Sequence, residues 1–161
     1  MSTSALYLLD TNMVSYLVTG RSAAVRRAYF EHEPHATIAI SAVTEAEIRF
    51  GLERKPEAIR LRGTFEEFFA AIPVLAWDSD VAKAYGRLRA GINATGRSLA
   101  LMDLLIAAHA VAAGATLVSH DQGFAQLTPF LAVVDWAKDL YASASSNRSV
   151  RSVRSGLFWP I

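Results

Sequence analysis

The sequence predicts an α/β fold with a central parallel β-sheet flanked by helices on both faces. Short apolar runs of strand length alternate with longer segments of helical spacing, an order that favours parallel strands joined by helices. Hydrophobic residues make up 52% of the chain and charged residues 19%, so the chain can bury a substantial core. Polar residues follow several of the apolar runs, where a parallel sheet presents its carboxyl edge.

Five segments have the composition of buried strands. Each is a run of five or six residues, rich in apolar, β-branched or aromatic side chains and bounded by polar ones. In chain order they are residues 5–9 (ALYLL), 36–41 (ATIAIS), 72–77 (IPVLAW), 115–119 (ATLVS) and 131–136 (LAVVDW).

Helical spacing characterises four longer segments, residues 42–54, 56–71, 79–92 and 98–114. In the first of them, one helix stripe consists of Ala42, Val43, Ala46 and Phe50. We expect this apolar stripe to face the core. The last segment is almost entirely apolar and predicts a buried helix, which Ser98 can cap and Gly114 can end.

The length of 161 residues is typical of one domain, which we expect to span residues 1–140. Residues 141–161 are rich in Ser and Arg and predict a tail. All 15 acids lie in residues 1–140 with 13 of the 16 Lys and Arg, so this part has a net charge of −2 and no general affinity for nucleic acid is expected. Cysteine is absent, and the first residues lack the features of a signal peptide or membrane span. We therefore expect a cytoplasmic protein with no membrane contact.

Two aspartates directly follow predicted strands. Asp10 ends the run YLLD, and Asp121 follows TLVSH. Because the carboxyl ends of parallel strands meet at one edge of the sheet, these carboxylates should lie close together. Either residue alone is more often the cap of a following helix than a ligand.

Two further acids interrupt apolar helices. Glu47 adjoins the apolar stripe of its segment, although such a residue taken alone is more often solvated. Asp103 is the only charged residue within residues 98–114. A lone buried carboxylate costs several kcal/mol unless it is paired, and this helix offers no Lys or Arg; a satisfied core acid and a functional site remain equally open.

Four carboxylates around one pocket would repel one another unless a cation neutralises them or their pKa values rise. Oxygen ligands suit Mg²⁺ or Mn²⁺ rather than zinc, and such a centre is typical of phosphodiester hydrolysis, with nucleic acid as the expected substrate. Histidines with the spacing of a zinc site, a Walker A loop and a G-x-S-x-G motif are all absent.

These residues resemble those of the PIN-domain ribonucleases, and within them the VapC-type toxins of prokaryotic toxin–antitoxin modules. The likeness extends over about residues 6–136 and rests on motifs in a fixed order. They are LLDTN at 8–12, ISAVTEAEIRFG at 40–51, LMDLLIAAHAVAAGATLVSHD at 101–121 and LAVVDW at 131–136. The resemblance implies a PIN-like α/β/α domain with an acidic pocket for Mg²⁺ or Mn²⁺.

The resemblance also implies individual roles. The metal-site and catalytic acids would be Asp10, Glu47, Asp103 and, as a more variable fourth, Asp121, with Asn12 and Ser119 as supporting polar residues. Water activated by the metal would attack an RNA phosphodiester in line. Gly123 stands where relatives often carry an acid, which leaves the number of metal ions open.

Partners follow from the same resemblance: a cognate VapB-type antitoxin, an RNA substrate such as tRNA or rRNA, operator DNA reached only through the antitoxin, and a second copy in a homodimer. Candidates for phosphate contacts are Arg49, Arg87, Arg89 and Arg97, although each is more often a solvated surface charge. The arginines of the tail either add non-specific affinity or only solubilise this end of the chain.

Two other hypotheses remain. The chain could be a weakly or non-catalytic partner of a DNA-binding antitoxin, which four intact acids disfavour. It could instead be a metal-dependent phosphatase, but DTN lacks the second aspartate that an aspartyl-phosphate enzyme needs.

Overall fold

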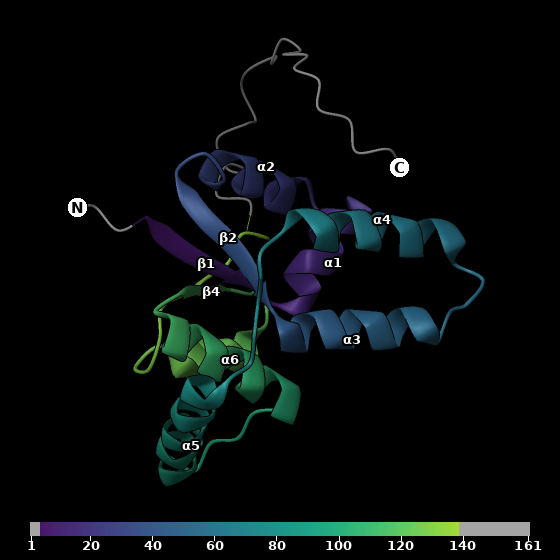
Figure 1. The fold of residues 1–161 in the computed structure, drawn as a ribbon. Coiled ribbons are helices and arrows are strands. Elements are labelled where there is room, and N and C mark those ends of the chain that lie inside the picture. Colours follow the sequence, from purple (N-terminus) through teal and green to yellow (C-terminus); the bar gives the residue numbers. More distant parts are fainter. Residues whose placement is uncertain (1–3, 139–161) are drawn as a thin grey trace.

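A computed structural model describes residues 4–138 and confirms the α/β class. Its sheet has five parallel strands in the order β3-β2-β1-β4-β5 (Figure 1). The strands are β1 (Ala5–Leu9), β2 (Ala36–Ser41), β3 (Val74–Leu75), β4 (Thr116–Val118) and β5 (Val133–Val134). The helices are α1 (Thr11–Thr19), α2 (Ala23–His32), α3 (Ala42–Glu53), α4 (Ile59–Ala71), α5 (Ser79–Ala94) and α6 (Leu101–Ala113), with a 3₁₀ helix η1 (Gln122–Leu127).

The sheet separates two hydrophobic cores. Side chains alternate between its faces, so Leu8 of β1 packs with α5, α6 and η1, while Leu9 packs with α1, α2, α3 and α4. In Figure 1 the α3–α4 hairpin projects from the sheet, and α5 and α6 lie together on the other side. The central strands β1 and β4 therefore have both faces covered, as their continuous apolar sequences predict.

Several element boundaries differ from those expected. The strands β3 and β5 have two residues each, because only these pair in the sheet. Ser98 does not cap α6: Ala100 occupies that position and makes no side-chain capping bond. Gly114 does end α6, with a φ of 62° that favours glycine.

The apolar stripe predicted on the α3 segment is wrong for Ala46 and Phe50, although Val43 packs against the core that contains Leu8. Ala46 is exposed and Phe50 is 66% exposed, whereas the buried residues of α3 are Thr44, Ile48 and Leu52. Ile48 and Leu52 pack in the core that contains Leu9. These three residues also repeat every four positions, so they form an equally regular stripe, and packing against the sheet selects it.

The predicted tail, residues 141–161, lies outside the described part of the chain, and so does the predicted domain boundary at residue 140. Between residues 4 and 138, none of the helices has the length and apolar character needed to cross a membrane.

Candidate active site

Asp10 lies at the carboxyl edge of the sheet, where β1 passes into α1. Leu9 is paired with Val118 across the β1–β4 ladder, and the Asp10 N–H donates to the Val118 carbonyl oxygen at 3.1 Å. The register therefore places Asp10 beside Ser119. The Asp10 side chain is buried and caps α1, accepting a hydrogen bond from the Met13 N–H at 2.7 Å.

The electrostatics of Asp10 show that other carboxylates lie nearby. The pKa of Asp10 is raised from 3.8 to about 6, mainly by burial, while hydrogen bonds from Ser119 and Met13 act in the opposite direction. The negative charges of Asp103 and Asp121 contribute to the increase. The chain thus places a buried acid from β1 within reach of acids from α6 and from the segment after β4.

Glu47 is connected to the same edge through Thr11. It is half-buried on α3, and its Oε2 accepts a hydrogen bond from the Thr11 hydroxyl on the first turn of α1. Thr11 stands between Asp10 and Asn12 in the motif LLDTN, yet the sequence did not single it out. Its position next to Asp10 was the available signal, but its contact with α3 depends on helix packing.

Asp103 is half-buried rather than fully buried, because it lies in the first turn of α6. Partial burial raises its pKa, and the charges of Asp121 and Glu47 raise it further. The expectation of an isolated buried carboxylate within an apolar helix is therefore corrected. The residue lies where α6 begins, within electrostatic range of two of the other predicted acids.

Asp121 is exposed and caps η1. Its Oδ1 accepts a hydrogen bond from the Gly123 N–H at 2.7 Å, and its own N–H donates to the Ser119 hydroxyl oxygen at 3.0 Å. A Cβ atom added at Gly123 would lie 3.1 Å from that Oδ1, a tighter approach than most Cβ atoms make. Glycine at this position therefore suits the capping role of Asp121.

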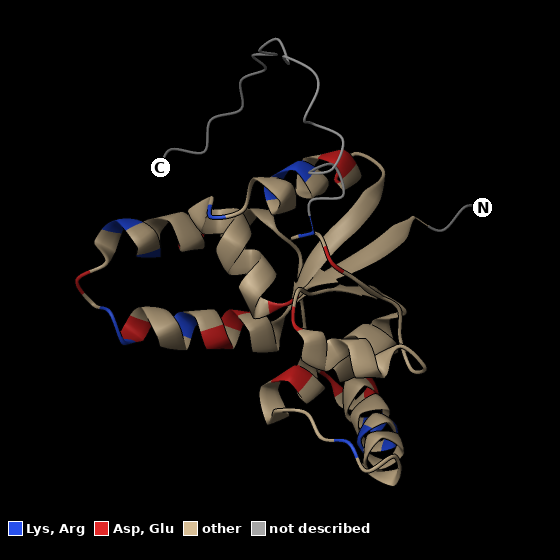
Figure 2. Ribbon diagram, turned by 180° about the vertical axis from the view of Figure 1, so that it is seen from behind, with Lys and Arg blue, Asp and Glu red and all other residues tan. Residues whose placement is uncertain are grey.

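The four predicted acids interact electrostatically, but they do not surround a common point closely. Figure 2 shows acidic segments of α3 and α6 near the junction of β1 and α1. Within residues 4–138, however, no three His, Asp or Glu side chains are placed so that they could hold one metal ion. Three of the four acids instead accept protein hydrogen bonds, as described for Asp10, Glu47 and Asp121.

The donor set nevertheless fits a hard divalent cation in its chemistry. Its side chains offer only oxygen ligands, and like charge raises the pKa values of Asp10 and Asp103, an effect that a bound cation would reverse. Holding an ion would require side-chain rotation. Of the supporting residues, Ser119 is buried against Asp10, whereas Asn12 is exposed and its side chain has no hydrogen bond within the described chain. The assignment of these residues as metal ligands stays a prediction.

Two histidines occupy different environments. His109 is buried, with Nδ1 2.8 Å from the Ser41 hydroxyl oxygen, and burial lowers its pKa, as expected of a packed core residue. His120 precedes Asp121, and its Nδ1 lies 2.8 Å from Oδ2 of Asp135, at the end of β5. Asp135 was not singled out from the sequence, although it completes a polar group at this edge.

The arginines proposed for phosphate contact are largely engaged within the protein. Arg49 pairs with Glu45 and Glu66 at 2.8 and 2.6 Å. Arg89 donates to the Tyr85 hydroxyl, and Arg97 donates to a backbone carbonyl of η1. Their assignment to RNA binding stays a prediction, and for Arg49 it would require breaking two ion pairs.

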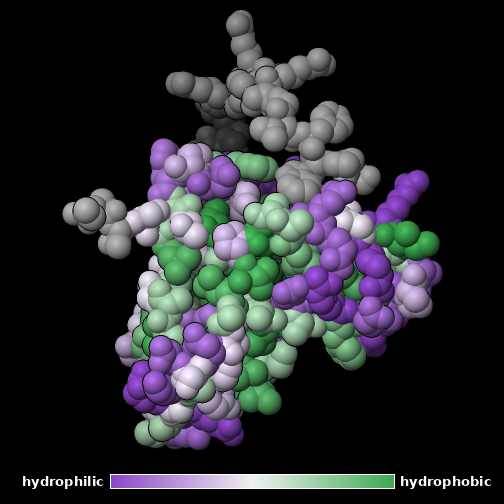
Figure 3. Space-filling view, in the orientation of Figure 1, coloured by the Kyte–Doolittle hydropathy of each residue, from purple (hydrophilic) through white to green (hydrophobic). Residues whose placement is uncertain are grey.

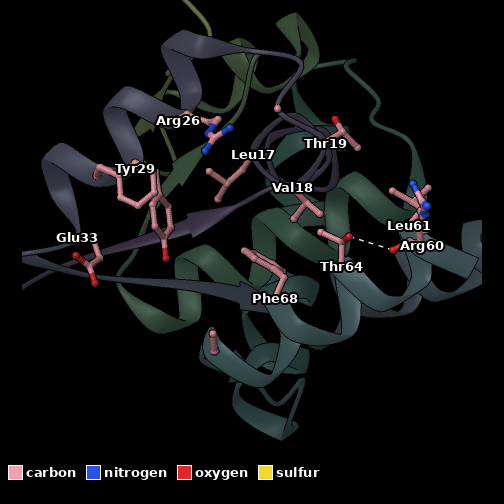
Figure 4. A pocket seen from close by; sticks show the side chains of 13 residues that line it. Leu17, Val18, Thr19, Arg26, Tyr29, Glu33, Arg60, Leu61, Thr64 and Phe68 are labelled. Atoms are coloured by element: carbon pink, nitrogen blue, oxygen red, sulfur yellow. Dashed lines mark hydrogen bonds between the residues drawn. The ribbon is translucent and has the colours of Figure 1, made fainter. Parts of the chain in front are cut away.

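A separate cavity of about 630 Å³ lies among α1, α2 and α4 (Figure 4). Its walls are mainly apolar and aromatic: they include Leu17, Val18, Tyr29, Leu61 and Phe68. Arg26, Glu33 and Arg60 supply charge at its margin. This cavity does not include the four acids, and its composition suits an amphipathic peptide segment.

Comparison with known proteins relates the chain to one family. The PIN domain family matches residues 7–128. VapC ribonuclease Y4jK of Sinorhizobium fredii is 32% identical and aligns with 72% of this chain and 87% of its own. The tRNA(fMet)-specific endonuclease VapC of Shigella flexneri is 28% identical, and the alignment covers 81% of this chain and 98% of that protein. VapBC2 from Rickettsia felis, solved bound to a DNA fragment from its promoter, superposes with a TM-score of 0.76 at 27% identity. The superposition covers 81% of this chain and 98% of that chain.

Proposed function

The chain belongs to the PIN domain family, as its motifs predict, and on this basis we propose that it is an endoribonuclease of the VapC group. It acts in the cytoplasm as the toxin of a toxin–antitoxin module and cleaves phosphodiester bonds of tRNA or rRNA, which inhibits translation. The observation that carries this proposal is the electrostatic coupling of Asp10, Glu47, Asp103 and Asp121 at one edge of the sheet. The ribonuclease names of its relatives support the same activity.

Asp10, Glu47, Asp103 and Asp121 would hold Mg²⁺, or Mn²⁺ in its place. When bound, the cation would activate water and stabilise negative charge on the phosphate oxygens. Hydrogen bonds from Met13 and Ser119 hold the buried Asp10 carboxylate in position. Thr11 orients Glu47, and the exposed Asp121 lies where solvent and substrate can reach it.

A cognate antitoxin of the VapB type would neutralise the enzyme. The cavity among α1, α2 and α4 offers an apolar surface for one face of a helical peptide, with Arg26 and Arg60 available for its acidic residues (Figure 4). Solved neighbours include DNA-bound VapBC complexes. In this proposal the chain reaches operator DNA only through the antitoxin, and it forms a homodimer.

Cleavage of total cellular RNA by the purified full-length protein tests the proposal. Discrete products are expected with Mg²⁺ or Mn²⁺, none with EDTA, and none from Asp103→Asn. Asp80→Asn is the matched control, because Asp80 is an exposed acid paired with Lys83 near the opposite end of α6. Products that persist in EDTA, or in Asp103→Asn, would refute the metal-dependent mechanism.

The alternative of a non-catalytic partner requires a separate test in cells. Expression of the wild-type chain without antitoxin should inhibit growth, whereas Asp10→Asn should not. Growth inhibition that survives this substitution would show that toxicity does not depend on cleavage.

A further inference from the structure

Phe50 is an exposed aromatic residue on the same helix as Glu47. Its side chain is 66% exposed, although a phenylalanine is ordinarily placed in a core. The opposite side of α3 is buried through Thr44, Ile48 and Leu52. Phe50 is therefore held on the outer side of a well-packed helix, where its ring has no role in the core.

The position of Phe50 along α3 connects it with the carboxylate cluster. Residues three apart on a helix are neighbours, with Cβ atoms about 5–6 Å apart, so Phe50 lies one turn beyond Glu47. Glu47 contacts Thr11 and raises the pKa of Asp103. Phe50 thus lies within one helical turn of an acid of the cluster.

Arg54 adds a positive charge to the same surface. It directly follows α3, is exposed, and its Cζ lies 5.9 Å from the centroid of the Phe50 ring. Arg49 and Arg62 are tied to glutamates, but Arg54 has no ion-pair partner between residues 4 and 138. Its guanidinium group lies over one face of the Phe50 ring, and it carries a positive charge that can meet a phosphate.

We propose that Phe50 and Arg54 form a platform that binds an unpaired base next to the RNA bond that is cleaved. This inference rests on the proposed ribonuclease activity and assigns Phe50 and Arg54 a role in holding its RNA substrate. Bases in a duplex are already stacked on their neighbours, whereas unpaired bases can stack on an aromatic ring with Arg beside it.

The surroundings of Phe50 favour RNA over a second protein copy. A stable interface buries about 800 Å² on each partner, and its core is depleted of charge. Along α3, Phe50 is surrounded by the charged residues Glu47, Glu53 and Arg54. The visible face of the α3–α4 hairpin is mainly hydrophilic, with hydrophobic atoms at its end and along its lower edge (Figure 3). Such a surface offers one stacking position and a phosphate contact rather than an extended apolar contact.

Binding of a short fluorescent oligoribonucleotide tests the platform. All proteins carry Asp10→Asn, so that the RNA stays intact in Mg²⁺. Phe50→Ala should weaken binding about 5- to 160-fold, the range that corresponds to removal of a stacking aromatic residue, and Phe50→Trp should preserve it. Unlabelled RNA should also quench the tryptophan fluorescence of the Phe50→Trp protein. The quenching at the new indole is obtained by comparison with the parent protein, which contains only the natural tryptophans. Ile59→Ala, another exposed apolar side chain (76%), is the control and should bind like the parent.

Three results would overturn the platform: equal affinity of Phe50→Ala and its parent, a Phe50→Trp protein whose fluorescence RNA does not change, or equal Phe50-dependent binding of a matched RNA duplex. If Phe50→Ala converts a dimer to a monomer in sedimentation without changing RNA affinity, the surface belongs to a second copy instead. If instead the proposed ribonuclease function is wrong, the result differs: RNA binding would depend on Phe50, but the protein with native Asp10 would cleave no RNA.

Discussion

Replacing Asp10 with Asn should stabilise the metal-free protein at neutral pH while it removes the proposed activity. Asp10 is buried, and its pKa is raised from 3.8 to about 6, so folding disfavours its ionised form. A shift of about 2 units corresponds to about 3 kcal/mol. Asn carries no charge and is also a good N-cap, so the Met13 contact can be kept. We expect a gain of about 1–3 kcal/mol in the free energy of unfolding.

The pH dependence of this gain has a definite sign. Because the pKa of Asp10 is higher in the folded state, the contribution of Asp10 to stability is complete below about pH 4 and is lost as the pH rises through about 6. The wild type and Asp10→Asn should therefore have similar stability near pH 4. Their difference should grow to its full size by about pH 7.5.

Urea unfolding in EDTA at several pH values between 4 and 7.5 measures the difference directly. Asp80→Asn serves as control, since this exposed acid should show little pH-dependent change. Adding Mg²⁺ at pH 7.5 should stabilise the wild type more than Asp10→Asn and so narrow the gap. Equal stability of the two proteins at pH 7.5, or a gap that does not change with pH, would refute this reasoning.

Three further substitutions separate catalysis, partner binding and folding. Thr11→Val should lower kcat about 10-fold, because Glu47 loses its hydrogen bond, and Thr11→Ser should keep kcat near the wild-type value. Equal kcat values for the two variants in steady-state kinetics would show that the Thr11 hydroxyl has no role in catalysis. Leu17→Arg should abolish antitoxin binding in calorimetry but leave RNA cleavage intact, because Leu17 lines the separate cavity; unchanged binding would place the antitoxin elsewhere. His109→Ala should destabilise the protein by about 2 kcal/mol in urea, with kcat unchanged, since His109 is buried against Ser41; a matching loss of kcat would contradict a purely structural role.

The sheet could be predicted well because burial on both faces leaves strong sequence signals. The segments that became β1 and β2 are continuous apolar runs, and their observed bounds, Ala5–Leu9 and Ala36–Ser41, agree with those expected. The helix α2 was not predicted: only Val25 is buried within it, so it has little apolar periodicity. The family resemblance is confirmed by the match over residues 7–128.

The buried face of a helix was harder to predict than the presence of the helix. In α3 two regular stripes compete, and the large apolar side chain of Phe50 favoured the wrong one. The buried Thr44 looks polar in sequence but lies inside, which only packing reveals. For the same reason the role of Thr11 could not be predicted, because its hydroxyl contacts Glu47, 36 positions away in the sequence.

The proximity of the candidate acids could be predicted because parallel strands bring their carboxyl ends to one edge. Asp10 follows β1 and Asp121 lies shortly after β4, and the charge of Asp121 acts on Asp10. Individual hydrogen bonds could not be predicted, since those of Asp10 and Asp121 depend on local backbone geometry.

Titration of the purified full-length protein with Mn²⁺, followed by electron paramagnetic resonance, tests the central claim that these carboxylates form one metal centre. The wild type should bind Mn²⁺ in competition with Mg²⁺. Asp10→Asn and Asp103→Asn should each bind at least about 10-fold more weakly, because each removes a charged oxygen ligand, and Asp80→Asn should bind like the wild type. Undiminished Mn²⁺ affinity in both site variants would contradict the account.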